Sequence, residues 1–374
     1  MIYPVWEANR CGYINNNGSL VVNFKYQDGK HSKDGVVPVK SEGAWHLADL
    51  KGDALFPQTY RGIWDPSEGL CSGLKFQAGK RHNDLYAYVD YDGREQFGID
   101  FDEAGPFSCG RASVRLQGSS VVIDKHGRHV FSTDNYAYIN EYKEDRAATA
   151  VCAKEEDLYG LVDLYGLVDL EGREVIPAKT AGPIDLYNGV CVVEWAGTGV
   201  SEVLDHNGCL VFRADQNINL IGLHDGVVYA EYSDSSRGVF LDTSGKPMCP
   251  AFSDYVPDLA AYAGFGSGLV QAMDKRTGKN GYINAYGEVE IPFKFSDCGR
   301  FSESRAIIHV KTPDLYSPAL ISVEGDYVIE PFQDISLIER CGDKVWQATK
   351  TNGEIWYYNK DGVVLWVSDP PRSH

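Results

Sequence analysis

Asn15-Asn16-Asn17-Gly18 is the first copy of a four-residue pattern, Asp/Asn-x-x-Gly, that organises the whole chain. Nine further copies begin at Asp49, Asp90, Asp124, Asp169, Asp205, Asp242, Asn284, Ser322 and Asn359. Successive copies start 34 to 45 residues apart. A constant short period of this kind is the signature of a repeat architecture, so we predict one tandem array, residues 1–374, of ten units of about 38 residues.

The residue types of the pattern predict a tight hairpin turn. A side-chain oxygen in the first position can accept a hydrogen bond from the backbone N–H two residues later, and the glycine can adopt a positive φ without a Cβ clash. We expect a type I turn followed by a glycine bulge. The structural turn glycines are Gly18, Gly52, Gly93, Gly127, Gly172, Gly208, Gly245, Gly287, Gly325 and Gly362. Because Asp, Asn and Ser interchange in the first position, we interpret these acids as structural rather than as metal ligands or proton carriers.

Short apolar runs surround each turn. Tyr13-Ile14 and Tyr282-Ile283 precede their turns, and a second run often ends at proline, as in Val175-Ile176-Pro177. Proline cannot donate to a sheet ladder, so it marks a strand end. A further run begins near glycine or arginine, as at Gly35 and Arg305. The pattern therefore predicts about three short antiparallel strands in each unit and an all-β fold class.

The unit resembles that of the bacterial WG-repeat proteins, which reads roughly Phe-x-Glu-Gly-Leu-Ala-x-Val followed by Trp-Gly-Tyr-Ile-Asp-x-x-Gly-x-x-Val-Ile-Pro. The best-matching stretches are residues 11–18, 165–172 and 280–287, while 301–306 and 64–70 match the preceding strand. Trp45 stands in the tryptophan position. The resemblance implies a tandem β-repeat fold and brings no catalytic residues with it.

Units of three or four strands cannot bury both faces alone, so neighbouring units must stack. We predict a propeller-like toroid of about ten three-stranded units. The alternative is an open superhelical β-solenoid, because familiar propellers have four to eight blades.

The composition restricts the classes of partner. The chain has 53 acidic and 35 basic residues, a net charge of −18, and no basic stripe, so we expect no nucleic-acid partner. No stretch is apolar enough to span a membrane, and no signal peptide is visible, so we expect no membrane partner and a cytoplasmic location. The nine cysteines show no Cys-x-x-Cys spacing. We predict no metal, no cofactor and no catalytic residue.

Two segments interrupt the regular period, residues 134–157 and 254–275, and in repeat proteins such insertions often carry binding loops. Tyrosine among acids suits a protein interface because tyrosine gives a large contact area at low entropic cost. The predicted partner-binding residues are Tyr136, Tyr138, Tyr142, Glu155, Glu156, Asp254, Tyr255, Asp258, Tyr262 and Phe265. The verbatim repeat of 158–163 as 164–169 is interpreted as a tandem slip, either copy of which could occupy the strand-pairing position.

These observations favour a non-enzymatic, protein-binding repeat scaffold. In a sharper form, the chain is an acidic inhibitor or immunity protein that neutralises a basic protein partner. The alternative is an enzyme or glycan-binding module with a pocket at the centre of the array, where residues from several units converge.

Overall fold

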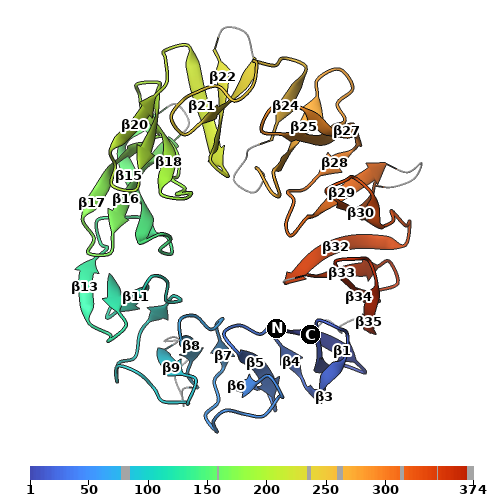
Figure 1. Ribbon diagram of the computed structural model, residues 1–374. Helices are drawn as coiled ribbons and strands as arrows, with labels where there is room; N and C mark the ends of the chain where they lie inside the picture. The colour runs from blue at the N-terminus through green and yellow to red at the C-terminus, as the bar shows by residue number, and fades with distance from the viewer. Residues whose placement is uncertain are drawn as a thin grey trace.

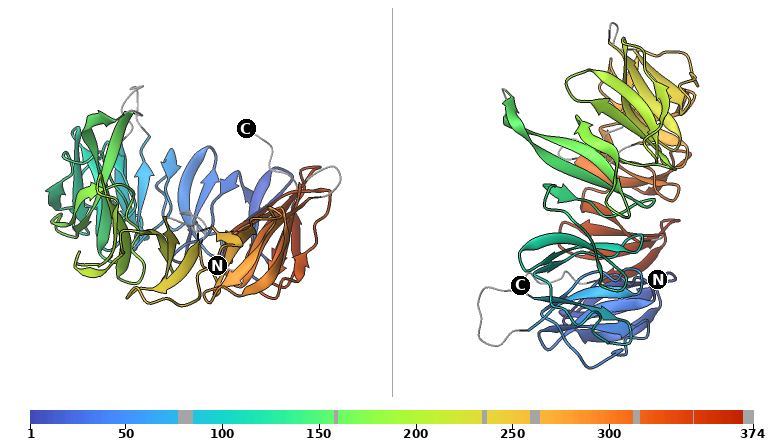
Figure 2. Two further views of the ribbon diagram at one scale, coloured as in Figure 1. Left: turned by 90° about the horizontal axis from the view of Figure 1, so that it is seen from above. Right: turned by 90° about the vertical axis from the view of Figure 1, so that its left-hand side faces the viewer.

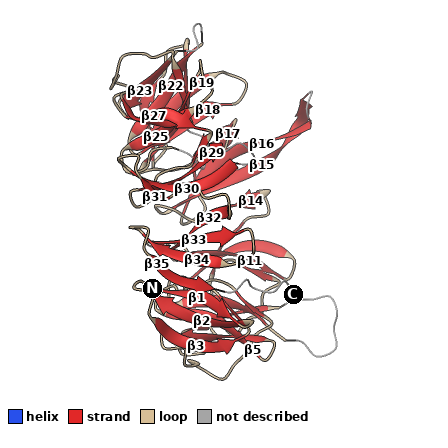
Figure 3. Cartoon of the chain, turned by 90° about the vertical axis from the view of Figure 1, so that its right-hand side faces the viewer, coloured by secondary structure: helices blue, strands red, loops and turns tan. Residues whose placement is uncertain are grey.

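The computed structural model describes residues 1–76, 85–157, 160–233, 237–258, 264–311, 316–342 and 344–368. Throughout this part of the chain the regular secondary structure is strand, with no helix (Figure 3). The first five units comprise β1 (Ile2–Glu7), β2 (Arg10–Asn15) and β3 (Leu20–Tyr26); β4 (Asp28–Gly29), β5 (Val36–Ser41) and β6 (Ala44–Asp49); β7 (Gly62–Ile63), β8 (Leu70–Leu74) and β9 (Tyr86–Asp90); β10 (Glu103–Ala104), β11 (Arg111–Leu116), β12 (Ser119–Asp124) and β13 (His129–Ser132); and β14 (Tyr138–Ile139), β15 (Arg146–Asp157), β16 (Gly160–Asp169) and β17 (Glu174–Thr180).

The last five units repeat the same arrangement. They comprise β18 (Val190–Trp195), β19 (Val200–Asp205) and β20 (Leu210–Arg213); β21 (Ile218–His224), β22 (Val227–Tyr232) and β23 (Gly238–Asp242); β24 (Tyr255–Pro257), β25 (Leu269–Asp274), β26 (Asn280–Asn284) and β27 (Val289–Phe295); β28 (Asp297–Cys298), β29 (Arg305–Lys311), β30 (Tyr316–Ser322) and β31 (Tyr327–Ile329); and β32 (Ile335–Gly342), β33 (Val345–Lys350), β34 (Ile355–Asn359) and β35 (Val364–Ser368).

Strands within a unit pair antiparallel in sequence order, and the units follow one another around a ring in which β1 lies against β35 (Figure 1). Units 5 and 6 share one sheet because β17 also pairs with β18, at Thr180 and Trp195. The expected all-β array of short antiparallel units is confirmed.

The ten repeated turns have the predicted geometry. Each turn glycine donates its N–H to the carbonyl of the first turn residue at 2.9–3.1 Å, and every turn glycine has φ between +73° and +85°. In the first turn, Asn15 Oδ1 also accepts from the N–H groups of Asn17 and Ser19 at 2.9 and 3.0 Å. The turn glycines thus have the positive φ that their place in the pattern predicts.

The same glycines form the joints between units. A Cβ on Gly362 of unit 10 would lie 2.2 Å from the carbonyl oxygen of Val328 in unit 9, and one on Gly93 of unit 3 would lie 2.3 Å from the ring of Phe56 in unit 2. The contact recurs between the two ends of the chain, where a Cβ on Gly18 would lie 2.6 Å from the carbonyl oxygen of Leu365. The first unit thus packs on the last as internal units pack on each other.

Tyrosine hydroxyl groups make a second recurring joint. Tyr13, Tyr88 and Tyr282 each donate to the carbonyl oxygen of the residue directly after the first strand of the following unit, at 2.5 to 3.1 Å. Tyr357 of unit 10 donates to Pro4 of unit 1 at 2.9 Å. This hydroxyl explains the tyrosine of the repeat motif, since a phenylalanine would leave the neighbouring carbonyl without its donor.

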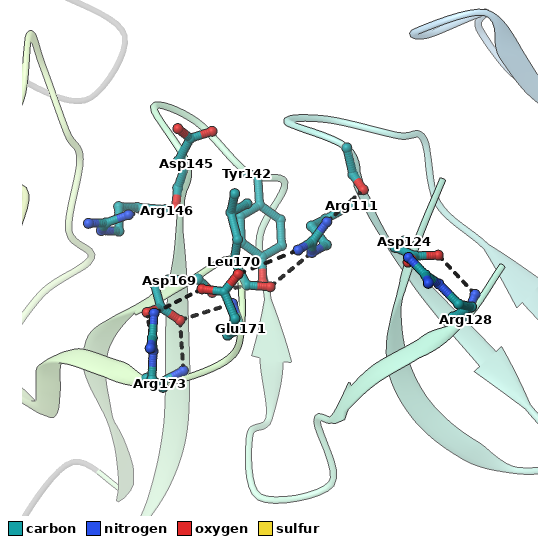
Figure 4. Close-up of polar contacts among 11 residues, drawn as sticks. Arg111, Asp124, Arg128, Tyr142, Asp145, Arg146, Asp169, Leu170, Glu171 and Arg173 are labelled. Carbon is teal, nitrogen blue, oxygen red and sulfur yellow. Dashed lines mark hydrogen bonds and ion pairs between the residues drawn. The ribbon is translucent and has the colours of Figure 1, made fainter. Parts of the chain in front are cut away.

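Arginine side chains make a third kind of joint in part of the ring. Arg111 Nε donates to the carbonyl of Leu170 in the next unit's turn at 2.9 Å, and its Nη2 lies 3.7 Å from Glu171 (Figure 4). Arg146 and Arg305 reach the equivalent turn carbonyls of their neighbours at 2.8 and 2.6 Å. The arginine that starts a strand in these units therefore ties one unit to the next.

The free edge of β1 is covered by side chains. Ser32 Oγ accepts from Ile2 N at 2.8 Å and donates to Ile2 O at 3.1 Å. Ser368 Oγ makes the same two bonds with Trp6, at 2.7 and 2.6 Å. The residue between them on this edge, Pro4, has no N–H to satisfy. Unit 2 and unit 10 thus close the strand edge that the N-terminus would otherwise leave open.

The hydrophobic core lies mainly between units, not within them. One cluster joins units 1 and 2, another joins units 4 and 5, and a third joins units 10 and 1 through Tyr3, Val5, Cys341 and Tyr357. Burial at every joint is the expected way for thin sheets to remove their apolar faces from water.

The duplicated hexapeptide lengthens one hairpin. The second copy takes the strand position, because Leu167 and Val168 lie opposite Ala148 and Ala147 and the turn follows at Asp169. Pairing continues beyond the unit to Asp157 and Gly160, so the β15–β16 hairpin projects from the ring (Figure 2). Residues 158 and 159, in the first copy, lie outside the described residues.

The turn carboxylates make stability depend on pH. Backbone N–H groups, first that of Asp53, lower the pKa of Asp49, and hydrogen bonds lower the pKa values of Asp205 and Asp242 in the same way. A depressed folded pKa contributes stability above the unfolded value of about 3.9 and loses it as the pH falls toward the folded value. We therefore expect stability to fall as the pH is lowered below about 4.

Replacing Asp49, Asp205 and Asp242 together by asparagine should preserve the turns, as Asn15 does, and flatten this pH dependence. The measurement is the urea midpoint as a function of pH. The control changes Asp53, Asp145 and Asp326 to asparagine, since no other residue donates to their side chains in the described contacts. An equal flattening in the control would contradict the assignment.

Candidate functional site

An aromatic cleft of about 380 Å³ runs across units 3, 4 and 5. It is lined by Trp64, Tyr86, Glu103, Ala104, Gly105, Ser113, Val114, Arg115, Ser120, Thr133, Tyr136, Ala137, Tyr138 and Ile139. Four aromatic side chains from two different units meet there. We name this set the aromatic cleft.

Local strand geometry positions the aromatic rings. Trp64 follows β7 directly, and its ring meets that of Tyr86 on β9 edge to face, with the centroids 5.1 Å apart. Tyr138 begins β14, a two-residue strand at the edge of its sheet that pairs through Ala150 of β15. Trp64 and Tyr138 remain 40% and 41% exposed. Large aromatic side chains exposed together in a hollow are typical of binding sites.

The polar groups of the cleft balance in charge. Glu103 and Arg115 form an ion pair at 3.5 Å, and both side chains are well exposed, so the pair adds little to stability. Burial, together with a hydrogen bond to Tyr165, raises the pKa of Tyr138, and burial near Glu174 raises the pKa of Tyr136. Both hydroxyl groups therefore stay protonated at neutral pH and can donate hydrogen bonds.

A second cavity of about 400 Å³ adjoins the cleft, because Trp64 lines both. It extends along units 2 to 5 past Lys30, Asp65, Phe107 and Glu141. Lys30 pairs with Asp65 at 3.2 Å. The two cavities give a binding surface long enough for more than one residue of an extended ligand.

The structure brings together two of the predicted partner-binding residues and shows that the prediction was wrong for two others. Tyr136 and Tyr138 both line the aromatic cleft. Tyr142 and Phe265, which were predicted at an interface, are only 4% and 1% exposed. Each residue comes just before a tight turn that leads into a strand. The side chain at this position packs into the joint between units, so neither residue can contact a partner.

The remaining predicted residues lie away from the cleft. Asp254, Tyr255 and Asp258 belong to unit 8, on the far side of the ring (Figure 1). Tyr255 stacks on Phe252 at 4.7 Å and donates to the carbonyl of Gly287 at 2.5 Å, which is a structural role. Asp258 accepts from Gln271. Asp254 is exposed.

Three predicted residues are not placed by the structure as side chains. Tyr262 lies outside the described residues. Glu155 and Glu156 lie on the projecting part of β15, and only their backbone is described.

Trp64 and Tyr86 were missed as site residues. In the sequence, Trp64 belongs to a stretch that resembles the repeat motif. The spacing of Trp64 and Tyr86 does not indicate that both side chains lie beside those of unit 5. The available signal was a tryptophan directly before Asp65-Pro66, outside the position that the repeat reserves for it.

Other site classes were considered over the same residues. Across the described ranges, no group of three or more His, Cys, Asp or Glu residues is arranged to hold a metal ion. Among the described segments, none forms a helix of the length and apolarity needed to cross a bilayer.

Comparison with solved structures shows the fold. The chain is similar to a structure described as the eukaryotic initiation factor, with a TM-score of 0.52 and 9% identity over 98% of this chain and 95% of that one. It is more distantly similar to BamB from Moraxella catarrhalis, with a TM-score of 0.36 and 12% identity over 71% of this chain and 87% of that one. Dipeptidyl peptidase 4 from Porphyromonas gingivalis matches with a TM-score of 0.46 and 10% identity over 91% of this chain and 59% of that one. The likeness to the first structure, with its TM-score of 0.52 and 9% identity, shows a propeller-type fold and nothing about activity.

Comparison by sequence identifies the repeat. No curated protein matches the chain. The family model described as WG containing repeat matches residues 12–45, 86–118 and 281–309. These segments include the hydroxyl-donating Tyr13, Tyr88 and Tyr282, and the same turn and strand pattern continues through all ten units. The chain therefore carries WG repeats in these three segments.

Proposed function

We propose that this chain is a non-enzymatic repeat scaffold that binds a protein partner, and that the aromatic cleft is its docking site. The observation that supports this proposal most directly is the meeting of Trp64, Tyr86, Tyr136 and Tyr138 in one hollow formed by adjacent units. Tyrosine and tryptophan dominate the energetics of protein interfaces. A repeat array offers a broad, rigid surface on which such anchors are held in place.

The residues of the cleft support binding more than catalysis. Its described lining holds one carboxylate, Glu103, and no histidine, cysteine or lysine. Acid–base or nucleophilic catalysis needs at least two groups with matched roles. The proposal therefore assigns recognition, and not turnover, to this site.

The charge of the chain supports a basic partner. With a net charge of −18, the protein attracts a cationic protein from a distance and accelerates encounter at low salt. In this proposal the chain is an acidic inhibitor, such as an immunity protein, that neutralises a basic partner. Long-range charge accelerates the approach, while the aromatic cleft sets the lifetime of the complex.

The test compares partner capture by the wild-type chain with capture by a Trp64→Ala, Tyr138→Ala double variant. We expect the variant to lose the partner through faster dissociation, by roughly 2–4 kcal/mol, because buried aromatic anchors act on the off-rate. Tyr286→Ala is the matched control, since this tyrosine is 63% exposed in the turn of unit 8 and lies outside the cleft. Association with the captured partner should slow markedly between about 50 and 500 mM salt.

If the double variant retained the partner, the aromatic cleft would not be the docking site. An acidic partner, or an association rate that is independent of salt, would remove the charge argument. Turnover of a small substrate by the purified chain would replace the scaffold with an enzyme.

A further inference from the structure

We propose that the aromatic cleft takes a neutral, proline-rich segment of the partner in an extended conformation. This inference rests on the proposed docking role of the cleft and adds the chemistry of what occupies it. It is carried by the aromatic rings, by the two strand edges that border the cleft, and by the balance of charge.

The aromatic rings favour a ligand with flat apolar faces. Trp64 and Tyr138 are each about two-fifths exposed, and Tyr86 supports the Trp64 ring from its edge. Grooves lined by tryptophan and tyrosine recognise polyproline II segments, whose pyrrolidine rings pack on the aromatic faces. Such a segment is already extended when free, so it loses little conformational entropy on binding.

The two strands at the border explain why an extended chain fits. Glu103–Ala104 and Tyr138–Ile139 are β10 and β14, both two residues long and both at the edge of their sheets. Edges this short cannot support a long ladder of backbone hydrogen bonds, so recognition by strand addition alone would be weak. A proline-rich segment needs few such bonds, because proline has no N–H and presents carbonyl oxygens to donors such as tyrosine O–H and tryptophan N–H.

The charges in the cleft point to a neutral occupant. Arg115 is paired with Glu103, and in the adjoining cavity Lys30 is paired with Asp65. Lys33 and Glu141 also line that cavity, so the two cavities together hold as many positive as negative side chains. A strongly charged segment would repel one member of each pair, whereas a neutral one leaves both pairs intact.

The experiment titrates decaproline, amidated at its C-terminus and labelled at its N-terminus with an uncharged fluorophore, into the full chain and follows fluorescence anisotropy. We expect saturable binding in the micromolar to millimolar range, changed less than about twofold by salt because the probe is uncharged. Trp64→Ala should weaken binding about tenfold or more, and Trp64→Phe about three- to tenfold, because it retains a ring but loses the N–H donor. Tyr286→Ala should bind as the wild type does.

Two controls separate the possible outcomes. A labelled glycine-serine decapeptide should not bind, because it has neither rings nor a preformed extended shape. A neutral tetrasaccharide is the competing occupant, and binding of the sugar without decaproline would overturn the inference in favour of a glycan site. Absence of decaproline binding up to millimolar concentration would also overturn it. If the captured partner nevertheless depended on Trp64, the proposed docking role of the cleft would stand without this ligand chemistry.

Discussion

Gly362→Ala is expected to destabilise the protein by roughly 2–5 kcal/mol. Two costs add at this position. The left-handed conformation, with φ at +77°, costs an L-residue about 1–2 kcal/mol. The new Cβ would also lie 2.2 Å from the carbonyl oxygen of Val328, so unit 9 must shift at a further cost of about 1–3 kcal/mol. The measurement is the free energy of unfolding from urea titration.

Gly35→Ala is the matched control for this substitution. Gly35 has φ of +82°, but no atom beyond its chain neighbours lies within 4 Å of the position that a Cβ would take. It should cost only the backbone part, about 1–2 kcal/mol. The difference between the two variants isolates the contact between units. Equal losses in the free energy of unfolding would mean that the turn glycines stabilise only their own hairpins and not the contacts between units.

The turns could be predicted from sequence because they are local. Four consecutive residues, Asn15 to Gly18, contain both the capping oxygen and the glycine with positive φ, so the geometry needs no information from elsewhere. Their use as joints could not be predicted in this way. The contact of Gly18 with Leu365 spans almost the whole chain, and it depends on the angle between neighbouring sheets rather than on any spacing.

The site shows the same division between local and distant information. Tyr136 and Tyr138 were found because they lie in a tyrosine-rich segment, and composition is visible in a sequence. Tyr142 lies in the same segment but packs into a joint between units. Its stretch, residues 142–147, has the aromatic, Glu, Arg and Ala positions of residues 301–306, so the sequence did contain a signal for its core position. Trp64 comes from two units earlier, so only the stacking of units places it beside Tyr138.

Ser368→Ala should weaken the junction between the first and last units and lower the free energy of unfolding by roughly 2–6 kcal/mol. The side chain is 1% exposed, and its hydroxyl both accepts from Trp6 N and donates to Trp6 O. Alanine would leave both backbone groups of this partly buried residue without a partner, and each such loss costs about 1–3 kcal/mol. Thermal and urea unfolding measure the total effect. Ser336→Ala is the control, because that serine is exposed in the same unit and donates only to Thr349.

The rate of thiol labelling can measure which contact between units opens locally in the Ser368→Ala variant. Cys341 lies in the cluster that joins units 10 and 1, and Cys191 lies in the cluster between units 5 and 6. Burial raises the pKa of both thiols to about 12, so both react slowly while the joints are packed. Because units in a repeat array open locally, Ser368→Ala should accelerate labelling of Cys341 and leave that of Cys191 unchanged. Equal acceleration of labelling at both cysteines would mean that the whole array unfolds cooperatively and that Ser368 does not stabilise the contact between units 10 and 1 in particular.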